Sequence, residues 1–476
     1  MNVLKKLSVE NLIYLKRWMV NSWVISSILI LSVTTSQRVF SMHRFNYQTA
    51  FIHQNGIEKL NFDALVQVTG TPCYIYSANQ IRHDLKTLTE TLPAELNYFY
   101  SLKANPNVSL IKIIRQYDVG CEVCSAAELE MALAAGATPQ QIIFVGPAKS
   151  PQELRRCVAL GIKAVVVESL AELRQLNDIA AEADRQQTFM LRINPDFSTE
   201  KARLVMSGKP RQFGIDESQA LAELSCLHHY PHLKMVGIHI YLGTRILDAE
   251  AIASNTRNIL VLAEKIQQQL SFPLQFVDIG GGLGVPYYAK EQPLDLAALG
   301  YSLAPLLAAF RQQFPQMQLM MELGRYMIAR AGIFVTRVRY LKDSKGSTFA
   351  ICDGGSNCHG AAAGLGSVIR KNFPVRRLAA RQEGAMQTYT LSGPLCTPTD
   401  IIADTVTLPR LAVGDLIGVF NSGAYGPTAS PVYFLSFGYP AEILVDGDRA
   451  TQIRKPDGVA HMLNQQQPVE LAIPQP

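Results

Sequence analysis

The sequence has little charge and no strong excess of one sign. Charged residues make up 17% of its 476 positions, and the net charge is +5. Five basic residues and one acidic residue lie within residues 1–41, so the rest of the chain carries a net charge near +1. A nearly neutral surface lacks the basic patch with which proteins hold the phosphates of a nucleic acid. We therefore expect no nucleic-acid partner.

Cysteine is too sparse for a framework of disulfides. Eight cysteines are spread over the chain, whereas disulfide-held scaffolds are short and dense in cysteine. Cys121 and Cys124 form one C-x-x-C pair, but no second pair follows at zinc-finger spacing. We interpret this pair as part of a buried strand and predict a cytoplasmic protein with reduced thiols and no metal.

A long hydrophobic run is also absent. The apolar stretch from Trp23 to Val33 is rich in serine and shorter than the roughly 20 residues that span a bilayer. Basic residues precede this stretch, as in an export signal or a short anchor, and Met42 follows it. Two interpretations of residues 1–44 stay open: an over-extended gene start, or a true signal or anchor. Elsewhere we expect no membrane contact, and residues 459–476 are expected to form a flexible tail.

Between residues 96 and 323, short β-branched or aromatic runs alternate with longer amphipathic stretches. Eight such strand–helix units fit a (β/α)8 barrel, whereas a doubly wound sheet seldom needs so many. The sequence therefore predicts an α/β protein with a TIM barrel over residues 78–325. The expected strands are Leu96–Leu102, Val119–Cys124, Ile142–Gly146, Ala164–Glu168, Thr188–Asn194, Met235–Leu242, Leu274–Ile279 and Leu319–Leu323.

Polar residues and glycines collect where the expected strands end. They are Lys103, Glu122, Gly146, Glu168, Arg192, His239, Tyr241, Gly280–Gly282 and Glu322. A TIM barrel builds its active site on this rim. We therefore expect these residues to surround one site.

After Arg325 the pattern changes to short strands separated by glycine and proline. This pattern is typical of an all-β domain. We predict a β-sandwich or β-barrel domain built from residues 45–77 and 326–458, to which Thr71–Tyr76 contributes a strand. The other expected strands include Gly332–Tyr340, Thr348–Cys352, Leu416–Phe420 and Ala441–Val445.

Three motifs of the predicted barrel have the chemistry of a pyridoxal-phosphate site. Such a site needs an amine for a Schiff base, a phosphate cradle and an acid at the pyridine nitrogen. Lys103 offers the amine, and Gly280–Gly282 would let backbone N–H groups approach a phosphate closely. Glu322, three residues before Arg325, offers the acid. Each motif alone also fits a plain structural role, namely a solvated lysine, a tight turn or an ion pair.

Two segments of the predicted β domain add reactive groups. Ser392–Cys396 places a cysteine on a turn, and Asn421–Gly426 offers the hydroxyl of Tyr425. Most lone cysteines in such a context only fill space in the core, so simple packing stays an alternative.

Together and in this order, the motifs resemble the fold-type III pyridoxal-phosphate decarboxylases, the ornithine/diaminopimelate/arginine group, over about Thr71 to Val445. The resemblance implies pyridoxal 5'-phosphate as cofactor, Lys103 as the Schiff-base lysine, and Cys396 as the group that returns a proton to the α-carbon after carbon dioxide leaves. It also implies that Asp353 and Arg325 contact the substrate. The cofactor-binding residues that it implies are Lys103, Glu122, Arg192, Tyr241, Thr244, Gly280, Gly281, Gly282, Glu322, Arg325 and Tyr425, with Glu128 in a supporting position.

In this family Asp353 and Cys396 reach the site from the partner subunit. The resemblance therefore implies a homodimer with shared active sites.

Three departures from the family's pattern concern the substrate. Thr397 stands where diaminopimelate and ornithine enzymes carry an acid, Tyr241 replaces a ring-stacking histidine, and Ser430–Leu435 replaces an arginine-rich segment. A distal ammonium or carboxylate thereby loses its usual partners. The pattern is most similar to the branch that includes the butirosin-pathway decarboxylase of glutamyl groups on an acyl carrier protein. We predict an amino-acid substrate with a modified or carrier-bound side chain.

Three other functions stay open. The first is a diaminopimelate decarboxylase of lysine biosynthesis. The second is an amino-acid racemase, which is expected to pair the pyridine nitrogen with arginine, whereas this chain has Glu322. The third is a non-catalytic homologue, which is expected to lose cofactor residues, whereas Lys103 and Cys396 are present. These differences favour a decarboxylase.

Overall fold

The computed structural model describes residues 49–53, 55–198, 204–205, 208–367, 370–378 and 384–469. The chain divides into two compact units, Met1–Tyr47 and Gln48–Pro476, and all described residues belong to the second. The predicted extension over residues 1–44 lies outside the described residues. In the described part of the chain, no helix has the length and apolar character needed to cross a membrane.

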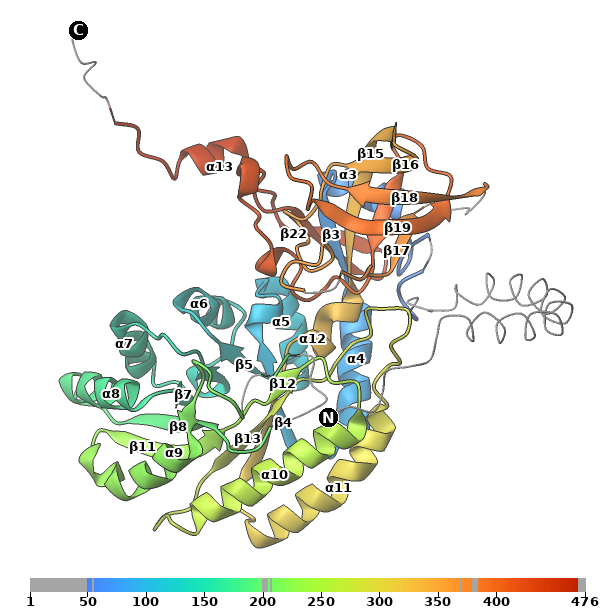
Figure 1. Cartoon of the computed structure of the whole chain (residues 1–476). Helices are drawn as coiled ribbons and strands as arrows, with labels where there is room; N and C mark the ends of the chain where they lie inside the picture. The colour runs from blue at the N-terminus through green and yellow to red at the C-terminus, as the bar shows by residue number, and fades with distance from the viewer. Residues whose placement is uncertain are drawn as a thin grey trace, which may run out of the picture. The chain divides into compact units, whose positions relative to one another are not determined.

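Eight parallel strands close into a barrel (Figure 1). They follow the order β8, β11, β13, β14, β4, β5, β6 and β7, and the pairing of β7 with β8 closes the ring. Their bounds are β4 Leu96–Ser101, β5 Gly120–Val123, β6 Ile142–Phe144, β7 Ala164–Val167, β8 Gln187–Asn194, β11 Leu233–His239, β13 Phe276–Gly281 and β14 Gln318–Leu323. The predicted TIM barrel is confirmed, with each expected strand within a few residues of its position.

Amphipathic helices cover the outside of the barrel, as α6, α7 and α8 show in Figure 1. Helix α7 illustrates how the local sequence sets such a helix. Ser150 accepts a hydrogen bond from the backbone of Glu153, whose side chain reaches back to the Ser150 amide, and Pro151 takes the first helical position. Gly161, with φ of 63°, ends the helix. The helices of the barrel layer are α4 Ala78–Thr91, α5 Val108–Ile114, α6 Ala126–Ala134, α7 Pro151–Leu160, α8 Leu170–Glu182, α9 Glu217–Glu223, α10 Ala249–Gln267 and α11 Leu296–Gln313.

The inside of the barrel is filled with apolar side chains. One buried cluster comprises Phe99, Ile143, Val145, Ala164, Val166, Met190, Val236, Phe276 and Met320. These residues lie on, or directly after, seven of the eight barrel strands. They form a packed core rather than a channel. A ligand can therefore reach only the rim of the barrel.

The second large sheet is built from the C-terminal part of the chain and one early strand, β3 Cys73–Ser77. β3 pairs antiparallel with β15 and parallel with β21, so the expected contribution of Thr71–Tyr76 is observed. Strands β17, β18, β19 and β22 were not named among the expected ones. The remaining bounds are β15 Gly332–Ser344, β16 Ser347–Cys352, β17 Val375–Leu378, β18 Met386–Ser392, β19 Ile401–Pro409, β20 Leu416–Val419, β21 Ala441–Asp446 and β22 Arg449–Arg454.

The predicted domain boundaries stay predictions. The tail expected from residue 459 begins with a short helix, α13 Val459–Leu463, whose side chains are mostly exposed.

Hydrogen bonds join the loop after β20 to the barrel rim. The amide of Tyr425 donates to the carbonyl of Ala104 at 2.8 Å, and Asn105 donates to the carbonyl of Gly423 at 3.2 Å. These bonds hold Tyr425 next to the segment that follows β4.

Candidate active site

A pocket of about 410 Å³ lies at the C-terminal ends of the barrel strands. This is the end at which TIM-barrel enzymes place their active sites. Eight of the predicted site residues line it, namely Lys103, Glu122, Arg192, Tyr241, Thr244, Glu322, Arg325 and Tyr425. The structure thus brings together residues that are up to 322 positions apart in the sequence.

Lys103 lies directly after β4, in the short 3-10 turn Leu102–Ala104. Its Nζ is 2.5 Å from Oε1 of Glu122, the buried residue near the end of β5. Burial alone would lower the pKa of Lys103, but the Glu122 carboxylate raises it well above its usual value. The ring of Tyr241 lies 5.8 Å from the same nitrogen. The amine is therefore held at one point of the pocket by an opposite charge and an aromatic face.

Glu322 presents an ionised oxygen to the pocket. It lies on β14, and its Oε2 is 3.0 Å from Nε2 of the buried His239 on β11. Burial would raise the pKa of Glu322, but His239 and, more weakly, Lys103 lower it below its usual value. Its other oxygen, Oε1, is buried and has no hydrogen-bond partner among the described residues. A protonated pyridine nitrogen is the kind of donor that would satisfy such an oxygen.

Asp278, on β13, lies beside this pair. Ligand atoms of His239, Asp278 and Glu322 lie within 4.8 Å of one another, an arrangement that could also hold a metal ion. Burial and the nearby Glu322 raise the pKa of Asp278 well above its usual value. With Asp278 neutral and Glu322 ionised, the arrangement suits a carboxylate that accepts a hydrogen bond from a protonated nitrogen. It suits a metal ion less well, because a divalent cation prefers ionised carboxylates.

Close packing against neighbouring backbones requires glycine at positions 280 to 282. Gly280 has φ of +69°, a conformation that favours glycine. A Cβ atom at Gly281 would collide with the carbonyl oxygen of Glu322, and one at Gly282 would collide with that of Gly243. The three glycines do not line the pocket themselves, whereas Thr244, next to Gly282, does. The Gly280 amide already donates to Oδ1 of Asp278 at 2.8 Å. Gly281 and Gly282, which carry no side chains, leave the backbone beside the pocket open to the close approach that a phosphate cradle needs.

Arg325 and Tyr425 form the neighbouring wall. The guanidinium of Arg325 lies 4.6 Å from the centre of the Tyr425 ring and donates to the hydroxyl of Tyr287 at 2.8 Å. Its Nε is buried without a partner among the described residues. Burial raises the pKa of Tyr425 to about 12, so its hydroxyl keeps its proton. Both side chains can donate to an anion placed between them and the glycine loop.

Arg192 is fixed by an acid behind it. Its Nη1 lies 2.8 Å from Oε1 of Glu168, which also accepts from the amide of Gly146 at 2.7 Å. Glu128 has a similar supporting position, since it accepts from the amide of Cys124 at 2.7 Å. These carboxylates hold the strand ends in place.

Two predicted site residues lie outside this pocket. Cys396 is exposed, and it is not among the lining residues. The carboxylate of Asp353 accepts hydrogen bonds from Thr71 at 2.7 Å and from Thr336 at 2.8 Å. It also lies 3.1 Å from Arg339. Within one chain, therefore, Asp353 ties parts of the β domain together.

The pocket also contains residues that sequence analysis did not assign to the site. Cys124, whose Sγ is 3.6 Å from Glu122, and Phe213 and Pro147 line it. His239 and Gly146, which the sequence placed on the barrel rim without a specific role, also line the pocket. Phe213 lies in a loop, where no periodic pattern indicates the direction of a side chain.

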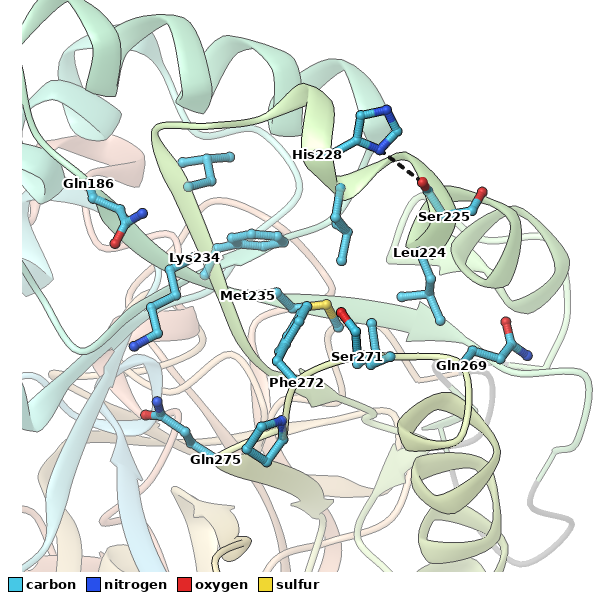
Figure 2. Close-up of a pocket in the computed structure, with 15 residues that line it drawn as sticks. Gln186, Leu224, Ser225, His228, Lys234, Met235, Gln269, Ser271, Phe272 and Gln275 are labelled. Atoms are coloured by element: carbon cyan, nitrogen blue, oxygen red, sulfur yellow. Dashed lines mark hydrogen bonds between the residues drawn. The ribbon is translucent and has the colours of Figure 1, made fainter.

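A second pocket, of about 730 Å³, lies at the opposite end of the barrel, where β8, β11 and β13 begin (Figure 2). Figure 2 shows Gln186 and Gln269 on opposite sides of it, so their polar groups do not converge. In TIM barrels this end serves stability rather than catalysis.

Comparisons with known proteins agree with this geometry. Residues 78–329 match the family described as "Pyridoxal-dependent decarboxylase, pyridoxal binding domain". The L-glutamyl-[BtrI acyl-carrier protein] decarboxylase of Niallia circulans is 36% identical over 82% of this chain and 92% of its own length. The diaminopimelate decarboxylase of Archaeoglobus fulgidus is 32% identical over 86% of this chain and 96% of its own.

A solved structure is similar as well. The diaminopimelate decarboxylase from Helicobacter pylori, complexed with L-lysine, gives a TM-score of 0.77 at 27% identity, over 85% of this chain and 99% of that one. The family match, the relatives and the ionised acid opposite the lysine all indicate the same chemistry. The chain belongs to the pyridoxal-dependent decarboxylase family: it is a carboxy-lyase that uses pyridoxal 5'-phosphate to decarboxylate an amino acid.

Proposed function

We propose that the enzyme removes the α-carboxylate of an amino acid whose side chain is joined to a carrier protein, such as a glutamyl thioester. The main support is the state of the acids in the pocket. The two carboxylates among its described lining residues already have partners, Glu122 with Lys103 and Glu322 with His239. Within one chain, the described lining of the pocket therefore has no further acid for the distal ammonium of ornithine, lysine or diaminopimelate. The relative from Niallia circulans acts, by its name, on a carrier-bound glutamyl group.

The residues of the pocket fit the cofactor as follows. Lys103 would bind its aldehyde carbon and Glu322 its pyridine nitrogen, while Arg325, Thr244, Tyr425 and the amides of Gly281 and Gly282 would bind its phosphate; Gly280, whose amide donates to Asp278, would hold the loop. Tyr241 and Arg192 would contact the ring and its substituents. When bound, pyridoxal phosphate accepts the electron pair that the breaking Cα–carboxylate bond releases. The lowered pKa of Glu322 supports this assignment, because an ionised carboxylate is a suitable acceptor for a protonated ring nitrogen.

Glu122 would control the proton of the amine. Lys103 must lose a proton before its nitrogen can act as a nucleophile, and Glu122 Oε1 is the acceptor 2.5 Å away. Glu322 has the opposite task. Because its pKa is lowered, it stays ionised and would keep the pyridine nitrogen of a bound cofactor protonated.

We further propose a homodimer in which Cys396 of one copy returns the proton to the α-carbon in the other. Cys396 is exposed and lies outside the pocket of its own chain, so a second copy would be needed to bring the thiol of this residue there. Large apolar side chains are also exposed on the same β domain, as expected of an uncovered interface. They include Tyr433, Phe434, Leu435 and Phe437, each between 43% and 57% exposed. A substrate contact of Asp353 belongs to the same proposal.

A reducing compartment, the cytoplasm, is proposed as the site of action. All eight cysteines lie among the described residues, and all are free thiols.

The substrate proposal is tested by measuring carbon dioxide release from a glutamyl–carrier thioester, free glutamate, meso-diaminopimelate, ornithine and lysine. We expect turnover of the thioester and little release from the free amino acids. Equal or greater kcat/KM with free meso-diaminopimelate would contradict the proposal and favour the diaminopimelate decarboxylases, which are 29–32% identical to this chain.

A further inference from the structure

A cluster of cations and tyrosines lies beside the phosphate end of the pocket. The guanidinium of Arg245 lies 5.1 Å from the ring centre of Tyr287 and 5.2 Å from that of Tyr288. Lys371, from the β domain, places its Nζ 5.4 Å from the Tyr288 ring. We call these four residues the Arg245 cluster. The faces of tyrosine rings attract cations, but they do not neutralise the positive charge of the cation.

The cluster adjoins a residue of the pocket itself. Tyr287 accepts a hydrogen bond from Arg325, whose guanidinium lies 5.4 Å from the centre of the same ring. Two guanidinium groups thus share one tyrosine. Like charges this close repel strongly in a half-buried setting, so their arrangement favours the arrival of anions.

No acid neutralises these cations in the described part of the chain. No carboxylate oxygen there lies within 4.0 Å of a charged nitrogen of Arg245, Arg325 or Lys371. Nη2 of Arg245 is buried without a partner among the described residues. The carboxylate of Glu291, close in sequence, accepts instead from the backbone amides of Tyr287 and Tyr288, at 2.7 and 3.1 Å.

The backbone holds Arg245 in this position. Its φ is 63°, a left-handed conformation that an arginine adopts only where its surroundings enforce it. The enforcement comes from the next residue, Ile246, whose amide donates to Gly282 at 3.0 Å and whose carbonyl accepts from Gly284 at 2.8 Å. Arg245 is therefore fixed to the same glycine loop that borders the cofactor site, and its guanidinium is directed at the tyrosines.

We propose that Arg245 and Lys371 bind a second anion, separate from the cofactor's phosphate, which the substrate carries. Arg325, Thr244 and the glycine loop are the groups proposed above for the cofactor's phosphate, and Arg245 and Lys371 are two further cations beside them. A carrier protein holds its acyl group as a thioester on a pantetheine arm, and a phosphodiester joins that arm to the protein. This phosphodiester is the anion that the cluster would take. The inference rests on the proposed carrier-bound substrate.

Direct binding tests the site without relying on turnover. Isothermal titration of the cofactor-loaded enzyme would compare 4'-phosphopantetheine with pantetheine, which differ only in the phosphate. We expect phosphopantetheine to bind about tenfold more tightly, since a charge-assisted contact is worth more than a neutral one. Arg245→Gln and Lys371→Gln should each reduce this advantage. Lys342→Gln, an exposed lysine on β15, serves as the matched control and should leave it unchanged.

The other possible results separate the anion site from the proposed substrate. If meso-diaminopimelate binds in an Arg245-dependent way and phosphopantetheine does not, the anion site stands but its ligand is a free distal carboxylate. If neither ligand depends on Arg245, or if Arg245→Gln weakens only the binding of pyridoxal phosphate, the proposal is overturned. If phosphopantetheine binding depends on Arg245 but the glutamyl thioester releases no carbon dioxide, the proposed substrate fails while the anion site remains.

Discussion

At the barrel rim, Lys103, Glu122 and Glu322 face one pocket, whereas Cys396 and Asp353 of the β domain lie outside it. The first three come from the ends of parallel strands. Because parallel strands in a closed barrel all end on one rim, their terminal side chains converge whatever the loops do. The two β-domain residues lie in bends after β16 and β18, which have no such constraint. One chain thus assembles the cofactor half of the site, whereas Cys396 and Asp353 would act there only from the second copy of the proposed homodimer.

The largest expected effect concerns the barrel half. Lys103→Ala should reduce carbon dioxide release by at least about a thousandfold, because a lost nucleophile removes a whole step of the reaction. It should also abolish the absorbance of the covalently bound cofactor. Lys112→Ala, an exposed lysine on α5, is the matched control. Substantial residual activity in Lys103→Ala would place the reactive amine elsewhere.

The charge of Glu322 is the next test of the barrel half. Glu322→Gln keeps the shape of the side chain and a partner for His239 but removes the ionised oxygen. Turnover should fall by about a hundredfold to a thousandfold, the range for losing one electrostatic contact in an active site. Steady-state assays at saturating cofactor separate this effect from weaker cofactor binding. Activity close to the wild type would mean that the ring nitrogen needs no acid.

A mixing experiment tests the β-domain half. Lys103→Ala and Cys396→Ala should each be nearly inactive alone. In an equimolar mixture, random exchange of subunits gives one intact site in each mixed dimer, so about a quarter of the wild-type activity should return. Carbon dioxide release after mild unfolding and refolding together measures this recovery. No recovery, with dimers formed, would show that Cys396 serves its own chain or has no catalytic role.

A smaller effect sharpens the comparison between two buried acids of the rim. Asp278 has a raised pKa and Glu322 a lowered one. A raised pKa means that the folded state holds a proton which the unfolded state releases, so stability falls as pH rises above the ordinary value of an aspartate. Asp278→Asn should therefore keep most activity at pH 7 and raise the unfolding temperature there by about 2 °C.

At acidic pH, where the unfolded state also holds the proton, this gain should vanish. Calorimetry at pH 7 and near pH 4 provides the comparison. A variant that is less stable at pH 7 would indicate that Asp278 is ionised in the folded protein.

Much of the fold could be predicted from local patterns. Runs such as Ala164–Val167 are too apolar and too β-branched for a surface helix, and capping residues such as Ser150 mark where helices begin. Strands β18 and β19 were not named because their threonines and Asp404 hide the alternation that marks a half-buried sheet.

The sequence by itself determined the barrel and the chemical groups at its rim, because period, caps and the residue at the end of each strand are local properties. Only the tertiary structure decided which charges meet. That Glu122 holds Lys103, that His239 holds Glu322, and that Arg245 shares a tyrosine with Arg325 depends on the register of strands and loops far apart in the chain. Register is set by packing of the whole molecule, and no short stretch of sequence contains it.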